Sequence, residues 1–112
     1  MNITIISGNV GSVKPAASFE NSKVLNFSVA VDKKYKNKKD ELVTETTWFD
    51  CSLWNREKVY PFIKVGTRVT IKGEIDARAY IDKDDASKAN AVLVLTVDEI
   101  DFINKPEADA EK

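Results

Sequence analysis

Apolar and polar residues alternate along much of this chain, and such alternation predicts β-strands with one buried face. The predicted strands are residues 3–10, 24–32, 45–54, 67–81 and 91–103. In the third of them Phe49, Cys51 and Leu53 share the apolar face, so Trp48 and Trp54 point the other way. The run AVLVL at the start of the last strand is apolar on both faces, so we expect both of its faces to be covered.

The remaining segments predict the connections between these strands. Residues 56–65 form the best candidate for a helix, shortened or kinked by Pro61 and followed by Gly66. Gly8, Gly11 and Gly73 interrupt strand patterns and predict bulges or bends. Three strands, a short helix and two more strands form the order of the OB-fold, a five-stranded Greek-key barrel. We therefore predict an all-β OB-fold with a short helix between its third and fourth strands.

The length of 112 residues fits one domain, and 43% hydrophobic residues suffice for one core. We assign residues 1–104 to the barrel and residues 105–112 to a short acidic tail. No apolar run is long enough for a membrane span, and the N-terminal residues lack the pattern of a signal peptide. The expected location is the cytoplasm.

Cysteine and histidine usage excludes several kinds of chemistry. One cysteine and no histidine leave no disulfide, no zinc site within one chain and no Ser-His or Cys-His pair. Asp84 and Asp85 lie in a polar stretch that lacks the glycine and distal glutamate of an EF-hand loop, so we expect a solvated loop. We expect no metal, no cofactor and no enzymatic activity.

The net charge of −1 conceals an uneven distribution. Residues 1–81 hold 13 Lys/Arg against 9 Asp/Glu, a balance of +4, whereas residues 82–112 hold 4 against 9, a balance of −5. A mildly basic body is compatible with binding of single-stranded nucleic acid where base stacking supplies much of the affinity.

The placement of the aromatic residues is the strongest functional signal. Trp48 and Trp54 fall on the polar face of one predicted strand, and Tyr80 falls on the polar face of another. Bases stack on such rings without regard to sequence, while basic residues beside them hold the phosphates. The candidates for base stacking are Tyr35, Trp48, Trp54 and Tyr80. The candidates for phosphate contacts are Lys33, Lys34, Lys36, Lys38, Lys72 and Arg78.

Each of these features also has an ordinary structural explanation. Both tryptophans could be packing residues under a loop or at a subunit interface, since large aromatic side chains are usually well buried. The lysine run in residues 33–43 could be a solvated hairpin loop, which is the default meaning of such a run.

Several short motifs follow one another along the chain: Gly8-Asn9-Val10-Gly11, Asn26-Phe27-Ser28-Val29-Ala30, Thr46-Thr47-Trp48-Phe49 with Leu53-Trp54, and Val65-Gly66 with Val69 and Ile71-Lys72-Gly73-Glu74-Ile75. Together, in this order, they resemble the bacterial single-stranded DNA-binding proteins. The resemblance covers about residues 3–103. It implies an OB-fold that assembles as a homotetramer and binds single-stranded DNA in replication, repair or recombination, with the same four aromatic residues stacking on bases.

Two departures from the family pattern affect what we expect. The family's acidic tip ending in Pro-Phe, which recruits other proteins, has no counterpart in residues 107–112, so we do not expect recruitment through it. Phe49 stands where the family usually has a histidine at a subunit contact, which predicts more apolar subunit contacts. The alternatives are a dimeric primosomal replication protein of the same fold, or an OB-fold module that binds protein or oligosaccharide.

Overall fold

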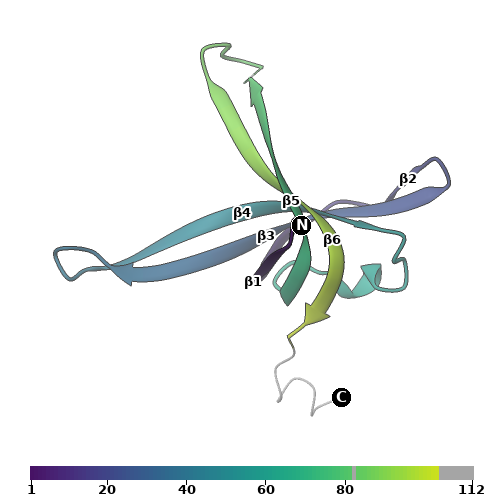
Figure 1. Cartoon of the computed structure of the whole chain (residues 1–112), viewed down its shortest axis with the longest axis horizontal. Helices are drawn as coiled ribbons and strands as arrows, with labels where there is room; N and C mark the ends of the chain where they lie inside the picture. The colour runs from purple at the N-terminus through teal and green to yellow at the C-terminus, as the bar shows by residue number, and fades with distance from the viewer. Residues whose placement is uncertain (82, 104–112) are drawn as a thin grey trace.

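The computed structural model describes residues 1–81 and 83–103. In this part of the chain almost all regular structure is β-strand (Figure 1). The elements are β1 (Thr4–Val13), β2 (Ala17–Phe19), β3 (Ser22–Lys36), β4 (Leu42–Trp54), the 3-10 turn η1 (Tyr60–Phe62), β5 (Arg68–Ile81) and β6 (Ala89–Phe102). The described residues include no helix that is long and apolar enough to cross a membrane. The expected barrel end at residue 104 and the expected tail at residues 105–112 lie outside the described residues.

The strands close into a barrel. Their order is β1-β5-β6-β4-β3-β2, and an additional pairing of β1 with β3 joins the two sides of the sheet. β4 and β6 run parallel, while all other pairs are antiparallel. Five long strands in this order confirm the predicted five-stranded OB-fold barrel, to which β2 adds a short sixth strand.

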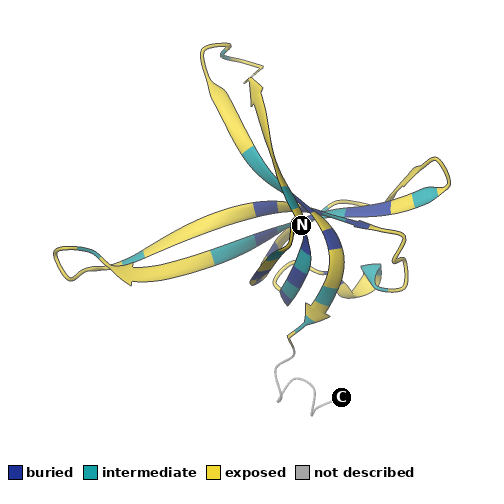
Figure 2. Ribbon diagram, viewed as in Figure 1, coloured by how far each residue is buried: buried dark blue, intermediate teal, exposed yellow. Residues whose placement is uncertain are grey.

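Alternating side chains build the core, as the sequence pattern predicts. Leu53 on β4, Ile71 on β5 and Leu95 on β6 are completely buried, and Cys51 is 1% exposed. Phe49 is 8% exposed inside its own barrel, so it belongs to the monomer core and offers little surface to a partner. Burial is concentrated where the strands cross, and the outer parts of the β3–β4 and β5–β6 hairpins are exposed (Figure 2).

Two of the three glycines that predict bends lie at irregularities in the strand pairing. The register of β1 with β3 shifts between Val10 and Ser12, which places a bulge at Gly11. The register of β5 with β6 shifts between Lys72 and Gly73. A Cβ at Gly73 would collide with the backbone of Thr96, so only glycine fits this crossing.

The segment predicted as a helix is mostly irregular. Residues 56–65 contain only η1, with Pro61 in its first turn. The Tyr60 hydroxyl donates to the carbonyl oxygens of Leu53 (2.8 Å) and Lys23 (3.1 Å), so tertiary contacts rather than helical hydrogen bonds hold the segment.

The sequence pattern did not predict β2. Ala17–Phe19 pairs with Ser22–Val24 to form a hairpin whose two turn residues, Glu20 and Asn21, have φ of 48° and 67°. Positive φ at both central positions is typical of a type I′ hairpin turn. Glutamate is rare at such a position, so the sequence Glu20-Asn21 did not indicate this turn.

Three hairpins project from the barrel (Figure 1). They are the β2–β3 hairpin, the long β3–β4 ribbon and the β5–β6 hairpin. The lysine-rich segment 33–43 therefore forms the end of a paired ribbon, with β3 reaching Lys36 and β4 beginning at Leu42.

Candidate nucleic-acid interface

One outward-facing surface carries both tryptophans. We call it the outer face: the side chains of β3, β4, β5 and β6 that point away from the barrel core. Directly paired residues in a sheet present their side chains on the same side. The register therefore places Trp54 beside Val24 at one end of the outer face and Trp48 beside Ala30 further along β4.

The two tryptophans are exposed, as their polar strand face predicts. Trp48 is 54% exposed and Trp54 is 39% exposed. They lie six residues apart on one strand, so about 20 Å separates their backbone positions. The Trp48 ring is supported from one side by β1, because a side chain at Gly11 would overlap it. The explanation that both tryptophans pack under a loop of the same chain is wrong.

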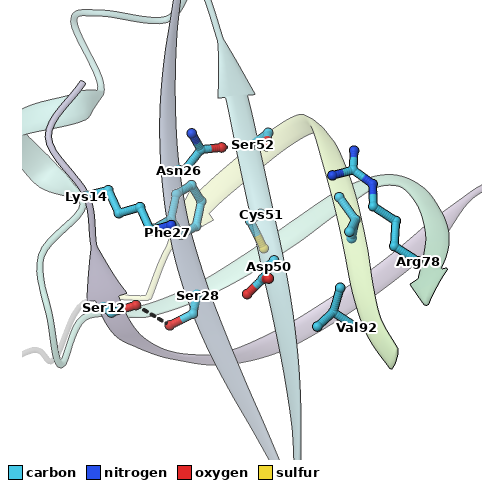
Figure 3. Close-up of a pocket in the computed structure, with 11 residues that line it drawn as sticks. Ser12, Lys14, Asn26, Phe27, Ser28, Asp50, Cys51, Ser52, Arg78 and Val92 are labelled. Atoms are coloured by element: carbon cyan, nitrogen blue, oxygen red, sulfur yellow. Dashed lines mark hydrogen bonds between the residues drawn. The ribbon is translucent and has the colours of Figure 1, made fainter. Parts of the chain in front are cut away.

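A shallow pocket of about 240 Å³ opens on the outer face close to this line of tryptophans (Figure 3). Its lining comes from β3, β4, β5 and β6 and from the end of β1 with the residue after it: Ser12, Lys14, Asn26, Phe27, Ser28, Asp50, Cys51, Ser52, Arg78, Val92 and Val94. The Ser52 hydroxyl donates to Asn26 Oδ1 at 2.7 Å, and the Ser12 and Ser28 hydroxyl oxygens are 2.7 Å apart. Small oriented polar groups beside apolar ones suit the edges and faces of nucleobases.

Charge is unevenly placed around this pocket. Arg78 and Lys14 supply positive charge, while Asp50 supplies a carboxylate between Trp48 and Trp54 on β4. Figure 3 shows Arg78 on the side of Val92 and Lys14 on the side of Phe27, with Asp50 between them. A carboxylate repels phosphate, so the middle of the pocket suits bases, and a sugar-phosphate backbone is better held at its two cationic sides.

Tyr80 extends the outer face onto the β5–β6 hairpin. It is two residues beyond Arg78 on β5, so both side chains point to the same side. Tyr80 pairs with Asn90 and is 52% exposed. The sequence-predicted grouping of Tyr80 with Arg78 is therefore present in the structure.

Tyr35 lies on the reverse side of the β3–β4 ribbon. It pairs with Val43. Tyr35 is an odd number of residues from Ala30, the partner of Trp48, so its side chain points to the side of the ribbon opposite the tryptophans. Its hydroxyl donates to Glu45 Oε2 at 3.2 Å, and Lys33 Nζ is 5.8 Å from its ring centroid. Desolvation, followed by the nearby Glu45 carboxylate, raises the pKa of Tyr35. The structure thus groups Tyr35 with Lys33 and separates both from the tryptophans.

The other predicted basic residues are dispersed. Lys34 and Lys36 lie on the tryptophan side of the ribbon, where Lys36 Nζ is 3.7 Å from Asp40 Oδ1. Lys38 lies in the turn between β3 and β4. Lys72 pairs with Ile5 of β1 and Glu99 of β6, so it is about 20 Å along β5 from Arg78.

Three contributors to this surface are not among the residues predicted from the sequence. Lys14 and Ser12 line the pocket, although both fall where the chain leaves β1 and shows no strand pattern of its own. Arg68 lines a second depression of about 400 Å³ with Lys34, Asp32 and Ala30, the residue paired with Trp48. The sequence places Arg68 on the polar face at the start of β5, but only the closed barrel brings Arg68 near Lys34.

The described residues contain no cluster of three or more His, Cys, Asp or Glu side chains that could hold a metal ion. The Asp85 carboxylate accepts hydrogen bonds from the hydroxyl and the backbone N–H of Ser87, which lower its pKa. Burial, with a smaller contribution from Asp50, raises the pKa of the Cys51 thiol to about 12. A thiol with that pKa is protonated at neutral pH and is a poor nucleophile.

The chain is similar in sequence to single-stranded DNA-binding proteins of bacteria. The chain is 33% identical over 60 residues to the single-stranded DNA-binding protein of Chlamydia pneumoniae, which covers 52% of this chain and 36% of that protein. It is 35% identical over 60 residues to the single-stranded DNA-binding protein of Chlamydia caviae, with the same coverage. The matching segment therefore spans about a third of the length of these relatives.

Solved structures share the fold at low sequence identity. A small single-stranded DNA-binding protein from Streptomyces coelicolor superposes with a TM-score of 0.73 at 16% identity, covering 90% of this chain and 93% of that one. A Plasmodium falciparum protein in complex with single-stranded DNA superposes with a TM-score of 0.73 at 18% identity, covering 93% and 96%.

The barrel topology and these likenesses agree with a match to a family model. The model is that of the single-strand binding protein family, and it matches residues 1–103. Because that match spans all the strands of the barrel, the chain belongs to the single-strand binding protein family.

Proposed function

We propose that this chain binds single-stranded DNA through contacts that do not recognise particular bases and without catalysis, and that it protects exposed strands during replication, recombination or repair in the cytoplasm. The observation that carries the proposal is the pair of exposed tryptophans on one pocketed face. Solvent-exposed tryptophans cost hydration free energy that a stacked base recovers. Family membership and the DNA-bound Plasmodium neighbour support the same conclusion.

In this proposal the outer face binds bases and its margins bind phosphates. Trp48, Trp54 and Tyr80 stack on bases, each contributing about 1–3 kcal/mol, and Tyr35 stacks on a base that has passed around the ribbon. The proposed phosphate contacts are Arg78 beside the pocket, Lys34, Lys36 and Lys38 along the ribbon, and Lys33 and Lys72 further from the tryptophans. Asp50 keeps phosphates away from the centre of the pocket, so it favours a strand whose bases point inward.

A titration with oligo(dT) tests the proposal directly. Stacked bases quench indole fluorescence, so emission from the unmodified chain should fall and reach a plateau as oligo(dT) is added. Duplex DNA of equal length is the control and should quench far less, because its bases are already stacked with one another. Unchanged emission and no shift in the anisotropy of a labelled oligonucleotide would contradict single-strand binding.

We also propose that the chain assembles with itself, most simply as four copies. Ile3 and Ile5 at the start of β1 are 52% and 64% exposed, which is unusual for isoleucine on a monomer surface. Val92 and Val94 on β6 also point away from the barrel core and are only partly buried. Light scattering at micromolar concentration should give the mass of four chains. A mass of two chains would favour the dimeric primosomal alternative, and a stable monomer would contradict assembly.

A further inference from the structure

The β2–β3 hairpin presents a large aromatic side chain that the sequence pattern did not single out. Phe19, the last residue of β2, is 61% exposed. It pairs with Ser22, while its neighbour two residues back, Ala17, pairs with Val24. Val24 in turn pairs with Trp54. Because paired side chains share a side, Phe19 and Trp54 point to the same side of the sheet and flank β3.

Val24 shows that this part of the outer face is continuous. Its side chain is 6% exposed, although it does not belong to the buried cluster inside the barrel. Its cover must therefore come from the outer side, where Trp54 and Ala17 are its paired neighbours. An apolar strip of Ala17, Val24 and Trp54 thus leads from the tryptophans to the hairpin that carries Phe19.

The base of this hairpin is held firmly. Asn55 Oδ1 accepts from the Lys23 backbone N–H at 3.0 Å, and the Asn55 backbone N–H donates to the Lys23 carbonyl at 2.8 Å. The Tyr60 hydroxyl donates to the same carbonyl at 3.1 Å. Lys23 is therefore fixed from two sides, and the type I′ turn two residues away fixes the tip. The backbone that carries Phe19 is therefore positioned before any ligand arrives.

We propose that Phe19 is a further base-stacking residue, which lengthens the DNA path past Trp54 onto the β2–β3 hairpin. The proposal rests on the proposed function. Phe19 lies two strands across and two residues along from Trp54, about 12 Å by strand spacings, so the two rings serve different bases of one DNA strand. The line from Trp48 through Trp54 to Phe19 then follows β3 across the outer face.

A fluorescent reporter at position 19 tests the proposal independently of the other rings. We would introduce Phe19→Trp into a chain carrying Trp48→Phe and Trp54→Phe, which keeps aromatic rings at both sites and leaves the new indole as the only tryptophan. Its emission is excited selectively, at wavelengths that the three tyrosines do not absorb. Emission should fall on addition of oligo(dT). The control is Phe62→Trp in the same background, because Phe62 packs against Phe102 at 6.3 Å, and Phe102 pairs with Val69 at the opposite end of β5 from Arg78. Its emission should change little.

Affinity provides the second measurement. Phe19→Leu keeps an apolar side chain of similar size and removes the ring, so it should weaken oligo(dT) binding about five-fold or more while the melting temperature stays unchanged. Unquenched emission from the Phe19→Trp reporter, with oligo(dT) bound by anisotropy, would overturn the proposal. A changed oligomeric mass for Phe19→Leu with unchanged intrinsic affinity would also overturn the proposal, because that result would show that Phe19 is a subunit contact. Failure of the unmodified chain to bind oligo(dT) would instead remove the proposed function itself.

Discussion

The indole of Trp48 lies against the backbone of Gly11, on a strand with which β4 does not pair. A Cβ built at Gly11 would lie 2.7 Å from Trp48 Cη2 and 3.3 Å from the Ser28 hydroxyl oxygen, closer than the ring can tolerate without moving. The bulge in β1 at Gly11 therefore creates the space in which the ring lies. The Trp48 ring can take this position because Gly11 of β1 has no side chain.

Gly11→Ala should displace the Trp48 ring and weaken oligo(dT) binding by about 1 kcal/mol, part of the loss expected for removing the ring. The φ of Gly11 is not positive, so alanine strains the contact with the ring and, to a smaller extent, the contact with the Ser28 hydroxyl, and the fold should persist. A double-mutant cycle gives the decisive measurement, because Gly11→Ala should cost almost nothing in a Trp48→Ala chain. Equal losses in both backgrounds would show that Gly11 acts on the barrel rather than on the ring.

Trp48→Ala and Trp54→Ala should each weaken oligo(dT) binding by about 1–3 kcal/mol. Both residues are exposed, so truncation leaves no cavity in the core and the thermal midpoint should change little. Phe62→Ala, an exposed aromatic residue on η1, is the matched control for affinity. If either tryptophan variant unfolds or binds like the unmodified chain, stacking at that position is wrong.

Tyr35→Ala should matter only for longer oligonucleotides. Its ring lies on the reverse side of the ribbon, and its hydroxyl is already bonded to Glu45. With the shortest oligo(dT) that binds, the loss should stay well below the roughly 1–3 kcal/mol of the tryptophans, and it should grow with length. Competition titrations over a length series measure this. A full loss with the shortest oligonucleotide would place Tyr35 on the primary path.

Salt dependence should report the phosphate contacts. For single strands log affinity falls with log salt by about 0.7 per phosphate neutralised, so three to five contacts give a slope of about −2 to −3.5. Replacing Lys34, Lys36 and Lys38 with alanine should flatten the slope by up to about two units. Lys58→Ala with Lys64→Ala removes positive charge near η1 and is the control. An unchanged slope in the ribbon variant would leave the lysines as a solvated surface.

Cys51 should resist alkylation in the native chain at pH 8 and react only after unfolding, because burial keeps the thiol protonated. Its pKa rises from an ordinary value of 9.0 to about 12 on folding. The protonated thiol therefore contributes stability that is complete below pH 9 and is lost as pH rises towards 12. Urea unfolding across this range should show a steeper loss for the unmodified chain than for Cys51→Ala. Identical slopes would contradict the shift.

The sequence predicted the barrel well because burial in a barrel imposes a period of two on every strand. Phe49, Cys51 and Leu53 point inward and Trp48 and Trp54 outward, as their alternation requires. Prediction failed where local pattern and tertiary contact disagree. Residues 56–65 have helical spacing, yet the Tyr60 hydroxyl bonds to two strand carbonyls and Pro61 restricts the backbone. β2 was missed because three residues are too short for alternation to register.

The candidate site was only partly predictable for a different reason. Alternation of apolar and polar residues predicts to which side of a strand each side chain points, but it does not predict which strands lie next to one another. It placed Trp48 and Trp54 together because they share β4, but it could not bring Lys14, Arg68 or Phe19 to them. It also left Tyr35 undecided, because the lysine-rich end of β3 is polar on both sides and only the pairing with Val43 fixes its direction.

The unbroken course of β3 from Ser22 to Lys36 sets the distance along the backbone between the two ends of the outer face. A single extended segment joins the hairpin of Phe19 to the ribbon of Lys34, so the spacing between these contacts is set before the ligand arrives. The entropy lost on association then falls mainly on the nucleic acid. A single-stranded DNA whose neighbouring bases stack on one another must first lose that stacking, whereas a DNA strand with little base stacking does not have to. We therefore expect thymine tracts to bind more tightly than adenine tracts, a preference that arises from the stiffness of the ligand and from no contact that recognises a base.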